Sequence, residues 1–327
     1  MVQTTESIAE LKERVLHGGE ITFEEALSLI EIEEASLLGA LTEAAHEITT
    51  AFHSNKAGLC SLINAKSYLC GEDCGFCAQS VRFETSTARY ELLEPEIIIQ
   101  AAKNAEKFGA QNFCIVTSGG ALNDAEFENI LGVVRRLRRE TKLGIDGSLG
   151  FLTPERVKHL KEAGLRRFNS NLQTSREFYP EVVSTHTYDT RIETLEYLRE
   201  GGVEVCSGGI LGMGESREDR VKMAFELKKF APECLPINIL NPRPGTPLEH
   251  ASKLEPDEII KTIAVYRFIL PKSNIKLAGG RELNLGSQQE RALRGGANGL
   301  IVGGYLTTAA NPVKQDLEML RRTGYDV

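Results

Sequence analysis

Three closely spaced cysteines are the residues of this chain whose types and spacing most clearly predict chemistry. Cys70, Cys74 and Cys77 follow the pattern Cys-x3-Cys-x2-Cys. Cuboidal [4Fe–4S] clusters usually take four thiolates. Three thiolates on one loop would hold three irons and leave the fourth iron open to a substrate or cofactor, so the spacing favours catalysis over a structural role.

A zinc site is the alternative interpretation of these cysteines. Structural zinc usually takes four Cys or His ligands. No fourth ligand follows Cys77 closely, although His53 and Cys60 lie upstream and could complete such a site. A non-catalytic metal-binding module therefore stays open as a second function class.

Composition narrows the class of protein. The chain has 327 residues, enough for one barrel-sized domain or two smaller ones, and a net charge of −8. Its one basic run, residues 135–139, falls in an expected helix, so nucleic acid is not an expected partner. No apolar run reaches membrane-spanning length, and the N-terminus lacks a signal pattern. An odd count of seven cysteines fits thiolate ligands in a reduced, cytoplasmic protein better than disulfides.

Short apolar runs alternate with amphipathic stretches from residue 59 onward. Residues 1–50 are expected to form an N-terminal helical segment, and residues 51–327 a barrel. Eight strands are predicted, with helices between them: 59–65, 112–117, 143–148, 166–171, 203–210, 235–240, 275–278 and 299–302. Strict alternation indicates a parallel α/β fold, and the count of eight favours a (β/α)8 TIM-type barrel over a doubly wound sheet.

Unusual polar residues fall on or just after these strands, where such barrels carry their chemistry. Asn169 and Asn171 are two residues apart and should point to one side of their strand. The others are Asn238, Cys60, Cys114, Cys206, Arg281 and the glycines Gly119 and Gly120. Each asparagine alone could satisfy local backbone groups, but the set converges on the end of the barrel that carries the cysteine loop.

Several stretches beyond the cysteine loop resemble the biotin synthase family of radical S-adenosylmethionine (SAM) enzymes. They are 64–67, 169–175, 205–210, 236–240, 245–248, 278–282 and 295–298, in the family's order. The resemblance implies a homodimeric sulfurtransferase that converts dethiobiotin to biotin. It also implies a [4Fe–4S] cluster that cleaves SAM to a 5′-deoxyadenosyl radical, an auxiliary iron–sulfur cluster ([2Fe–2S] or a variant) that donates sulfur, and an electron donor such as flavodoxin or ferredoxin.

The same resemblance assigns site residues. Cys70, Cys74 and Cys77 match the ligands of the SAM-cleaving cluster, whereas Cys114, Cys206 and Arg281 match ligands of the auxiliary cluster. Asn169, Asn171 and Asn238 match residues that grip the ureido ring. Arg191 matches the residue that holds the SAM carboxylate, and Asn171, Gln173, Gly119 and Gly120 are further cofactor-binding candidates.

Two positions depart from the family pattern. Asp146 stands where a third auxiliary cysteine is usual, so the composition and fourth ligand of that cluster stay open; Cys60 is a candidate replacement, and Cys234 is expected to be an ordinary buried thiol. Gln173 stands where an acidic residue often contacts the SAM ribose. A different radical SAM barrel enzyme, such as a metallocofactor maturase or a thiazole-forming lyase, therefore stays open as well.

Overall fold

A closed barrel of parallel strands forms the body of the computed structural model, which describes residues 4–308 and 311–327. Every strand pair is parallel, and the order is β5-β4-β3-β2-β1-β9-β8-β7-β6, with the ring closed by a β5–β7 pairing of Cys206 with Cys234. The strands are β1 (Gly58–Lys66), β2 (Asn112–Thr117), β3 (Gly144–Ser148), β4 (Arg167–Asn169), β5 (Glu204–Cys206), β6 (Gly209–Leu211), β7 (Cys234–Ile239), β8 (Asn274–Leu277) and β9 (Gly299–Ile301). The predicted eight-stranded barrel is confirmed.

One predicted strand, 203–210, is interrupted. Its two halves are β5 and β6, and the chain between them passes so close to β7 that a Cβ on Gly208 would overlap the carbonyl oxygen of Pro236. Glycine permits this approach because it has no side chain. The backbone of Gln173 pairs with the interruption: its N–H donates to the Gly208 carbonyl at 3.1 Å, and its carbonyl accepts from the Ile210 N–H at 2.8 Å.

Local capping interactions mark the ends of several helices. Thr22 and Glu25 form a capping box, Ser216 caps α8, and Gly164 ends α6 in the left-handed region with φ of 98°. The α-helices are α1 (Thr5–Leu16), α2 (Phe23–Ile30), α3 (Ala35–His53), α4 (Pro95–Lys107), α5 (Asp124–Glu140), α6 (Pro154–Ala163), α7 (Tyr188–Glu200), α8 (Arg217–Lys228), α9 (Pro256–Ile269), α10 (Arg281–Asn284), α11 (Gln289–Arg294) and α12 (Val313–Arg322), with short 3-10 turns at Tyr179–Glu181 and Gly286–Gln288.

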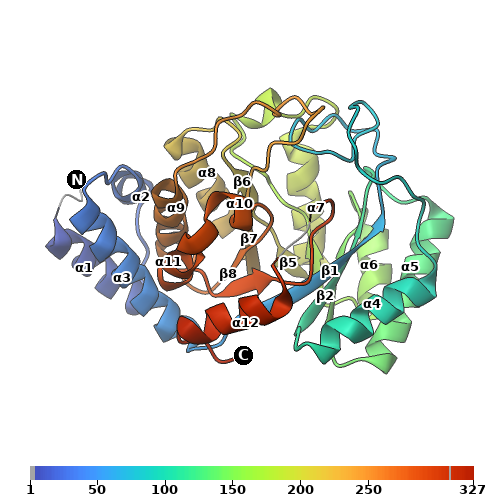
Figure 1. Ribbon diagram of the computed structural model, residues 1–327, viewed down its shortest axis with the longest axis horizontal. Helices are drawn as coiled ribbons and strands as arrows, with labels where there is room; N and C mark the ends of the chain where they lie inside the picture. The colour runs from blue at the N-terminus through green and yellow to red at the C-terminus, as the bar shows by residue number, and fades with distance from the viewer. Residues whose placement is uncertain (1–3, 309–310) are drawn as a thin grey trace.

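The N-terminal helices cover the outer face of α9. Figure 1 shows them in blue on the flank of the barrel, beside α9 and α11. As a result, every residue of α9 from Ile259 to Ile269 is buried, although an outer barrel helix normally keeps a solvated face. The buried guanidinium of Arg267 donates to the carbonyl of Gly296 at 2.8 and 2.9 Å and to Oδ1 of Asn298 at 2.8 Å, which fixes α9 to the segment before β9.

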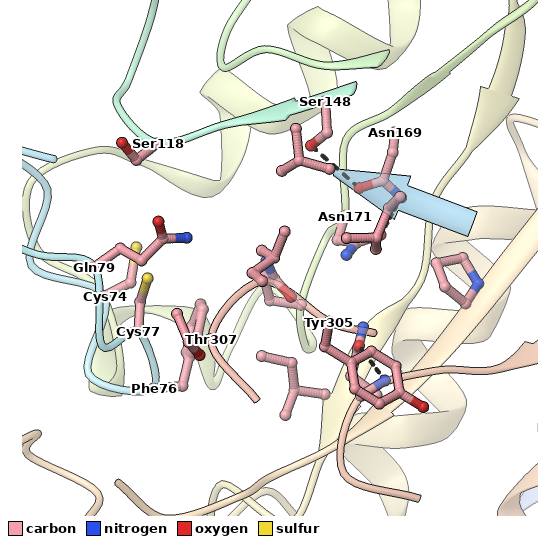
Figure 2. A pocket seen from close by; sticks show the side chains of 18 of the residues that line it. Cys74, Phe76, Cys77, Gln79, Ser118, Ser148, Asn169, Asn171, Tyr305 and Thr307 are labelled. Atoms are coloured by element: carbon pink, nitrogen blue, oxygen red, sulfur yellow. Dashed lines mark hydrogen bonds between the residues drawn. The ribbon is translucent and has the colours of Figure 1, made fainter. Parts of the chain in front are cut away.

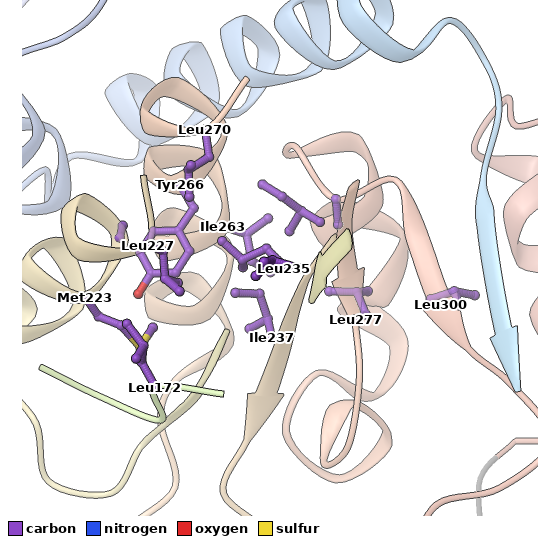
Figure 3. Packing of buried hydrophobic residues seen from close by; sticks show 14 of the residues in the cluster. Leu172, Met223, Leu227, Leu235, Ile237, Ile263, Tyr266, Leu270, Leu277 and Leu300 are labelled. Atoms are coloured by element: carbon purple, nitrogen blue, oxygen red, sulfur yellow. The ribbon is translucent and has the colours of Figure 1, made fainter. Parts of the chain in front are cut away.

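Successive side chains of β7 point alternately outward, to the helices, and inward, to the barrel interior. Leu235 and Ile237 are fully buried and point toward Ile263 and Tyr266 of α9 (Figure 3). Cys234, Pro236 and Asn238 occupy the intervening positions and line the interior cavity. The outward side chains thus pack the helices onto the barrel, and the inward ones are left for the site.

Long loops gather at one end of the barrel. The loop after β1, which carries the three cysteines, and the loop after β7 meet there (Figure 1), so closely that a Cβ on Gly245 would overlap the carbonyl oxygen of Glu84. No helix in the described ranges is both long and apolar enough to span a membrane.

Candidate active site

A cavity of about 430 Å³ occupies the interior and the loop end of the barrel, a volume typical of small-molecule sites. Figure 2 shows Cys74 and Cys77 on one side of it and Asn169 and Asn171 on the opposite side. The cavity gathers nearly all of the predicted site residues, namely Cys60, Cys70, Cys74, Cys77, Cys114, Gly119, Gly120, Asn169, Asn171, Gln173, Arg191, Cys206 and Asn238.

The cysteine loop is held by hydrogen bonds on both of its sides. Oε1 of Gln79 accepts from the Ser67 hydroxyl at 3.1 Å and from the Tyr68 N–H at 3.2 Å, and the Gly75 N–H donates to the Val182 carbonyl at 2.8 Å. Burial raises the pKa of Cys74 to about 12 and also raises that of Cys77. Such thiols are poor nucleophiles by themselves, but a bound metal deprotonates them, so the loop suits metal ligation.

A second group of cysteines comes from four different strands. Cys60, Cys114, Cys206 and Cys234 project from β1, β2, β5 and β7 into the same cavity. Hydrogen bonding with Cys206 lowers the pKa of Cys234, whereas burial raises that of Cys60 to about 11. We call these four residues the strand cysteines.

Charged side chains surround the strand cysteines. Arg167 donates to Oδ2 of Asp146 at 2.7 and 3.1 Å, and Lys276 of β8 is buried in the same place. Burial raises the pKa of Asp146 despite the guanidinium beside it, and Oδ1 of Asp146 has no hydrogen-bond partner among the described residues. Among all the residues that the structure describes, no three Cys, His, Asp or Glu side chains lie close enough together to hold a single metal ion. Four thiols with two adjacent cations fit an anionic sulfide-containing cluster, which is larger than one ion.

The asparagines lie on the side of the cavity away from the cysteine loop, where they bond to one another, to a strand cysteine and to the backbone. Nδ2 of Asn169 donates to Oδ1 of Asn171 at 3.0 Å and to the sulfur of Cys206 at 3.3 Å. Oδ1 of Asn238 accepts from the Gly279 N–H at 3.1 Å. These amides are therefore fixed by the barrel, and Asn169 lies directly against a strand cysteine.

Comparison with known proteins identifies the family. The pattern of the Radical SAM superfamily matches residues 66–227, and that of the Biotin and Thiamin Synthesis associated domain matches residues 236–326. A biotin synthase of Carboxydothermus hydrogenoformans is 45% identical over 98% of this chain and 99% of its own. That of Acetivibrio thermocellus is 44% identical over 97% and 98%. The chain belongs to the biotin synthase family. It is a radical SAM enzyme that inserts sulfur, and this decides against the maturase, lyase and non-catalytic alternatives.

Solved structures with low identity to this chain share its fold. A crystal structure of methylornithine synthase is 21% identical and matches with a TM-score of 0.84 over 97% of this chain and 96% of that one. The [FeFe]-hydrogenase maturase HydG is 17% identical and matches with a TM-score of 0.84 over 99% and 75%. The barrel fold is therefore shared with proteins whose names indicate other reactions, so the fold alone does not identify the biotin synthase family.

Arg281 does not lie with the other predicted residues. Its guanidinium, fully buried in α10, donates to Oδ2 of Asp316 at 2.6 Å and to the Tyr305 hydroxyl at 2.8 Å, and also to Gln289. It is absent from the cavity lining in the described part of the chain. Arg281 points away because the helix that it begins turns the side chain toward α12. In this biotin synthase family member, Lys276 is the basic residue of this stretch that reaches the strand cysteines.

Sequence reasoning missed a polar chain on the cavity wall. Glu72 and His186 both line the cavity beside Arg191, and Nδ1 of His186 lies 2.8 Å from Oε2 of Glu72. Burial, together with the Arg191 charge, lowers the pKa of His186, so that its imidazole is neutral at pH 7. Glu72 stands inside the cysteine motif and Lys276 inside a buried strand, and a charged residue at either place was the available signal.

Proposed function

We propose that this chain inserts sulfur into dethiobiotin to form biotin, with SAM as the source of the radical. The observation that carries the proposal is the contact between Asn169 and Cys206, within the cavity that also contains the cysteine loop. An amide that can bind a urea therefore lies beside a thiolate that can hold a sulfide donor. This adjacency is what sulfur insertion requires, because the reacting atoms must be positioned before the radical forms.

Cys70, Cys74 and Cys77 would hold the [4Fe–4S] cluster. When bound, this cluster supplies the electron that cleaves SAM. Arg191 faces the cavity with donors left over after its own hydrogen bonds, which suits a carboxylate. Gly119 and Gly120 let the backbone approach the cofactor closely, and Oε1 of Gln173, which has no partner in the described structure, can accept from a ribose hydroxyl.

The strand cysteines would hold the auxiliary cluster. Cys60, Cys114, Cys206 and Cys234 supply four thiolates without Arg281, and Asp146 is already engaged by Arg167. Burial would lower the pKa of Lys276, but the negative charge of Cys234 and Cys60 as thiolates outweighs burial and raises it, so that a charged ammonium offsets the charge of a thiolate-rich site. This ligand set would account for the departure at Asp146, because Cys60 and Cys234 would take the places of the missing cysteine and of Arg281.

Asn169, Asn171 and Asn238 would bind the ureido ring. A urea offers one carbonyl acceptor and two N–H donors, and a primary amide complements both. The apolar side chains of Leu62, Val116 and Ile210 line the same cavity and would exclude water from the carbon that loses hydrogen.

We also propose a homodimer, on the family resemblance, in the reducing cytoplasm, where all seven free thiols stay available. A flavodoxin or ferredoxin would supply the electron. Sedimentation of the purified chain tests the first proposal, and anaerobic turnover with each donor tests the last.

An anaerobic assay tests the function itself. Reconstituted protein is mixed with SAM, a reductant and dethiobiotin, and both 5′-deoxyadenosine and biotin are quantified. Formation of both is expected. Release of 5′-deoxyadenosine without biotin would overturn the substrate assignment, and the absence of SAM cleavage from iron-loaded protein would overturn the radical mechanism.

A further inference from the structure

A chain of four polar side chains runs from the cofactor side of the cavity to the cysteine loop. Nε of Arg191 donates to the Tyr179 hydroxyl at 2.7 Å, and that hydroxyl lies 2.8 Å from Nε2 of His186. Nη2 of Arg191 lies 3.2 Å from the same Nε2, and Nδ1 of His186 lies 2.8 Å from Oε2 of Glu72. Glu72 stands between Cys70 and Cys74, so the chain ends inside the metal-binding motif.

Only one arrangement of protons satisfies these contacts. A guanidinium can only donate, so the Tyr179 oxygen accepts from Arg191 and its single proton is free to go to His186. Nη2 of Arg191 can also only donate, so Nε2 of His186, 3.2 Å away, must be the unprotonated acceptor, and Nδ1 carries the proton that goes to the Glu72 carboxylate. A neutral imidazole therefore has an acceptor toward Arg191 and a donor toward the cysteine loop.

Packing leaves these four hydrogen-bonded side chains little freedom to rearrange. The His186 side chain is 7% exposed, and its ring meets that of Phe151 edge-on with centroids 4.9 Å apart. The guanidinium of Arg191 lies 5.6 Å from the Phe151 ring centroid and 5.9 Å from that of Tyr179.

Next to Glu72, the carboxylate of Asp73 accepts from the backbone N–H groups of Ser184 at 2.9 Å and Thr185 at 3.1 Å. The segment that carries His186 is thus joined to the cysteine loop at two adjacent residues.

We infer that His186 is a positioning residue that fixes the guanidinium of Arg191 through Nε2 while Nδ1 anchors the imidazole on Glu72. The inference rests on the proposed role of Arg191 toward the SAM carboxylate. Two donors of Arg191 are consumed by Tyr179 and His186, and this directs its remaining donors into the cavity. The geometry of the carboxylate site is thereby tied to the loop that binds the metal.

Two substitutions separate the Nε2 contact from the Nδ1 contact. His186→Asn places an amide N–H where Nδ1 stood and keeps the Glu72 bond, but offers nothing to Tyr179 or Arg191. Tyr179→Phe keeps the ring packing and removes the hydroxyl link. Each is loaded with iron anaerobically, and equilibrium dialysis measures its Kd for SAM and for decarboxylated SAM, with iron content as a second readout.

We expect both variants to retain the parent iron content and to raise the Kd for SAM about tenfold, the effect of ~1.4 kcal/mol of lost positioning. The Kd for decarboxylated SAM, relative to the parent, should stay nearly unchanged, because that ligand has no carboxylate for Arg191. Equal weakening of both ligands, or no weakening of either, would overturn the inference.

If His186→Asn fails to hold iron, the same comparison with Tyr179→Phe decides the question. A parent chain that itself fails to bind SAM would overturn the proposed function, whereas a parent that binds SAM beside unaffected variants overturns this inference alone.

Discussion

The side-chain amide of Asn169 donates a hydrogen bond to the sulfur of Cys206 across 3.3 Å. One residue belongs to the proposed ureido site and the other to the strand cysteines, on the adjacent strands β4 and β5, where they are register partners. Because a parallel sheet holds its register partners rigidly, the distance between the bound ring and the sulfur donor is set by the barrel rather than by a loop.

Replacing Asn169 should weaken substrate binding without stopping radical formation. Asn169→Ala removes an amide that would bind the ureido ring, and the loss of one or two hydrogen bonds is worth about 1–3 kcal/mol. The KM for dethiobiotin should rise about tenfold in an anaerobic biotin assay, while the rate of 5′-deoxyadenosine release with reductant alone stays at the parent value.

Ser148→Ala is the matched control for that variant. The Ser148 hydroxyl reaches Oδ1 of Asn169 at 3.4 Å, a long contact whose loss should change KM by less than about threefold. If the two variants raise KM equally, Asn169 acts through local structure rather than through the substrate.

Variants in the cysteine loop and variants in the strand cysteines should lose different activities. Cys74→Ala removes a ligand of the loop cluster and should abolish SAM cleavage. Cys206→Ala should leave SAM cleavage intact and stop biotin formation. Iron per chain should fall in both variants, and the measurement is paired quantification of 5′-deoxyadenosine and biotin. Loss of both products in both variants would contradict the division into two sites.

Substitution of Arg281 should lower the stability of the fold, whereas substitution of Lys276 should lower metal binding. Arg281→Met leaves Asp316 buried and without its partner, and breaking a buried ion pair costs about 3–5 kcal/mol of the free energy of unfolding. Iron content of the folded protein should not change. Lys276→Met removes the cation beside the strand cysteines and should reduce the retained iron instead.

Urea denaturation and iron analysis of both variants check this prediction. A stable Arg281→Met protein that has lost iron would restore Arg281 as a ligand.

Glu258 should make the stability of the fold sensitive to acid. Burial alone would raise its pKa, but hydrogen bonds from Arg217 at 2.6 and 2.9 Å and an ion pair with Lys261 at 2.6 Å outweigh burial and hold the pKa below its usual value. A carboxylate with a lowered pKa stabilises the fold above about pH 4.5, and this contribution is lost as the pH falls through the folded-state pKa.

Glu258→Gln should therefore cost about 1–3 kcal/mol at pH 7 and progressively less at lower pH. Urea denaturation of parent and variant at pH 7, 5 and 4 measures the difference. A difference that is constant across this range would show that the charge of Glu258 is not responsible.

Local patterns were sufficient to predict most of the fold. Strand periodicity predicted a strand over 112–117, and these are the bounds of β2 in the structure. The interruption between β5 and β6 could not be predicted, because it arises from the approach of Gly208 to Pro236, which are distant in sequence. A run of valine, cysteine and glycine has the same appearance in a continuous strand and in a broken one.

In the candidate site, too, residues close in sequence could be predicted and residues brought together by the fold could not. Cys70, Cys74 and Cys77 are close in sequence, so their spacing alone predicts a metal loop. Cys234 was predicted to be an ordinary buried thiol, and only the register of β5 against β7 places it opposite Cys206.

Lys276 and Arg281 come from one short stretch of sequence. The inward position of Lys276 depends on how β8 sits in the barrel, and the orientation of Arg281 depends on α10 and α12. These are long-range relationships that a motif does not contain.

The burial of the outer face of α9 by the N-terminal helices has a consequence for any shortened form of the protein. The helix is buried on its outer side as well as on its inner side, because α2 and α3 shield it from water. A chain begun at residue 51 would keep every cysteine of the cavity, yet it would present a bare hydrophobic strip to solvent. Such a fragment should aggregate through that exposed surface, even though it keeps all of its metal ligands.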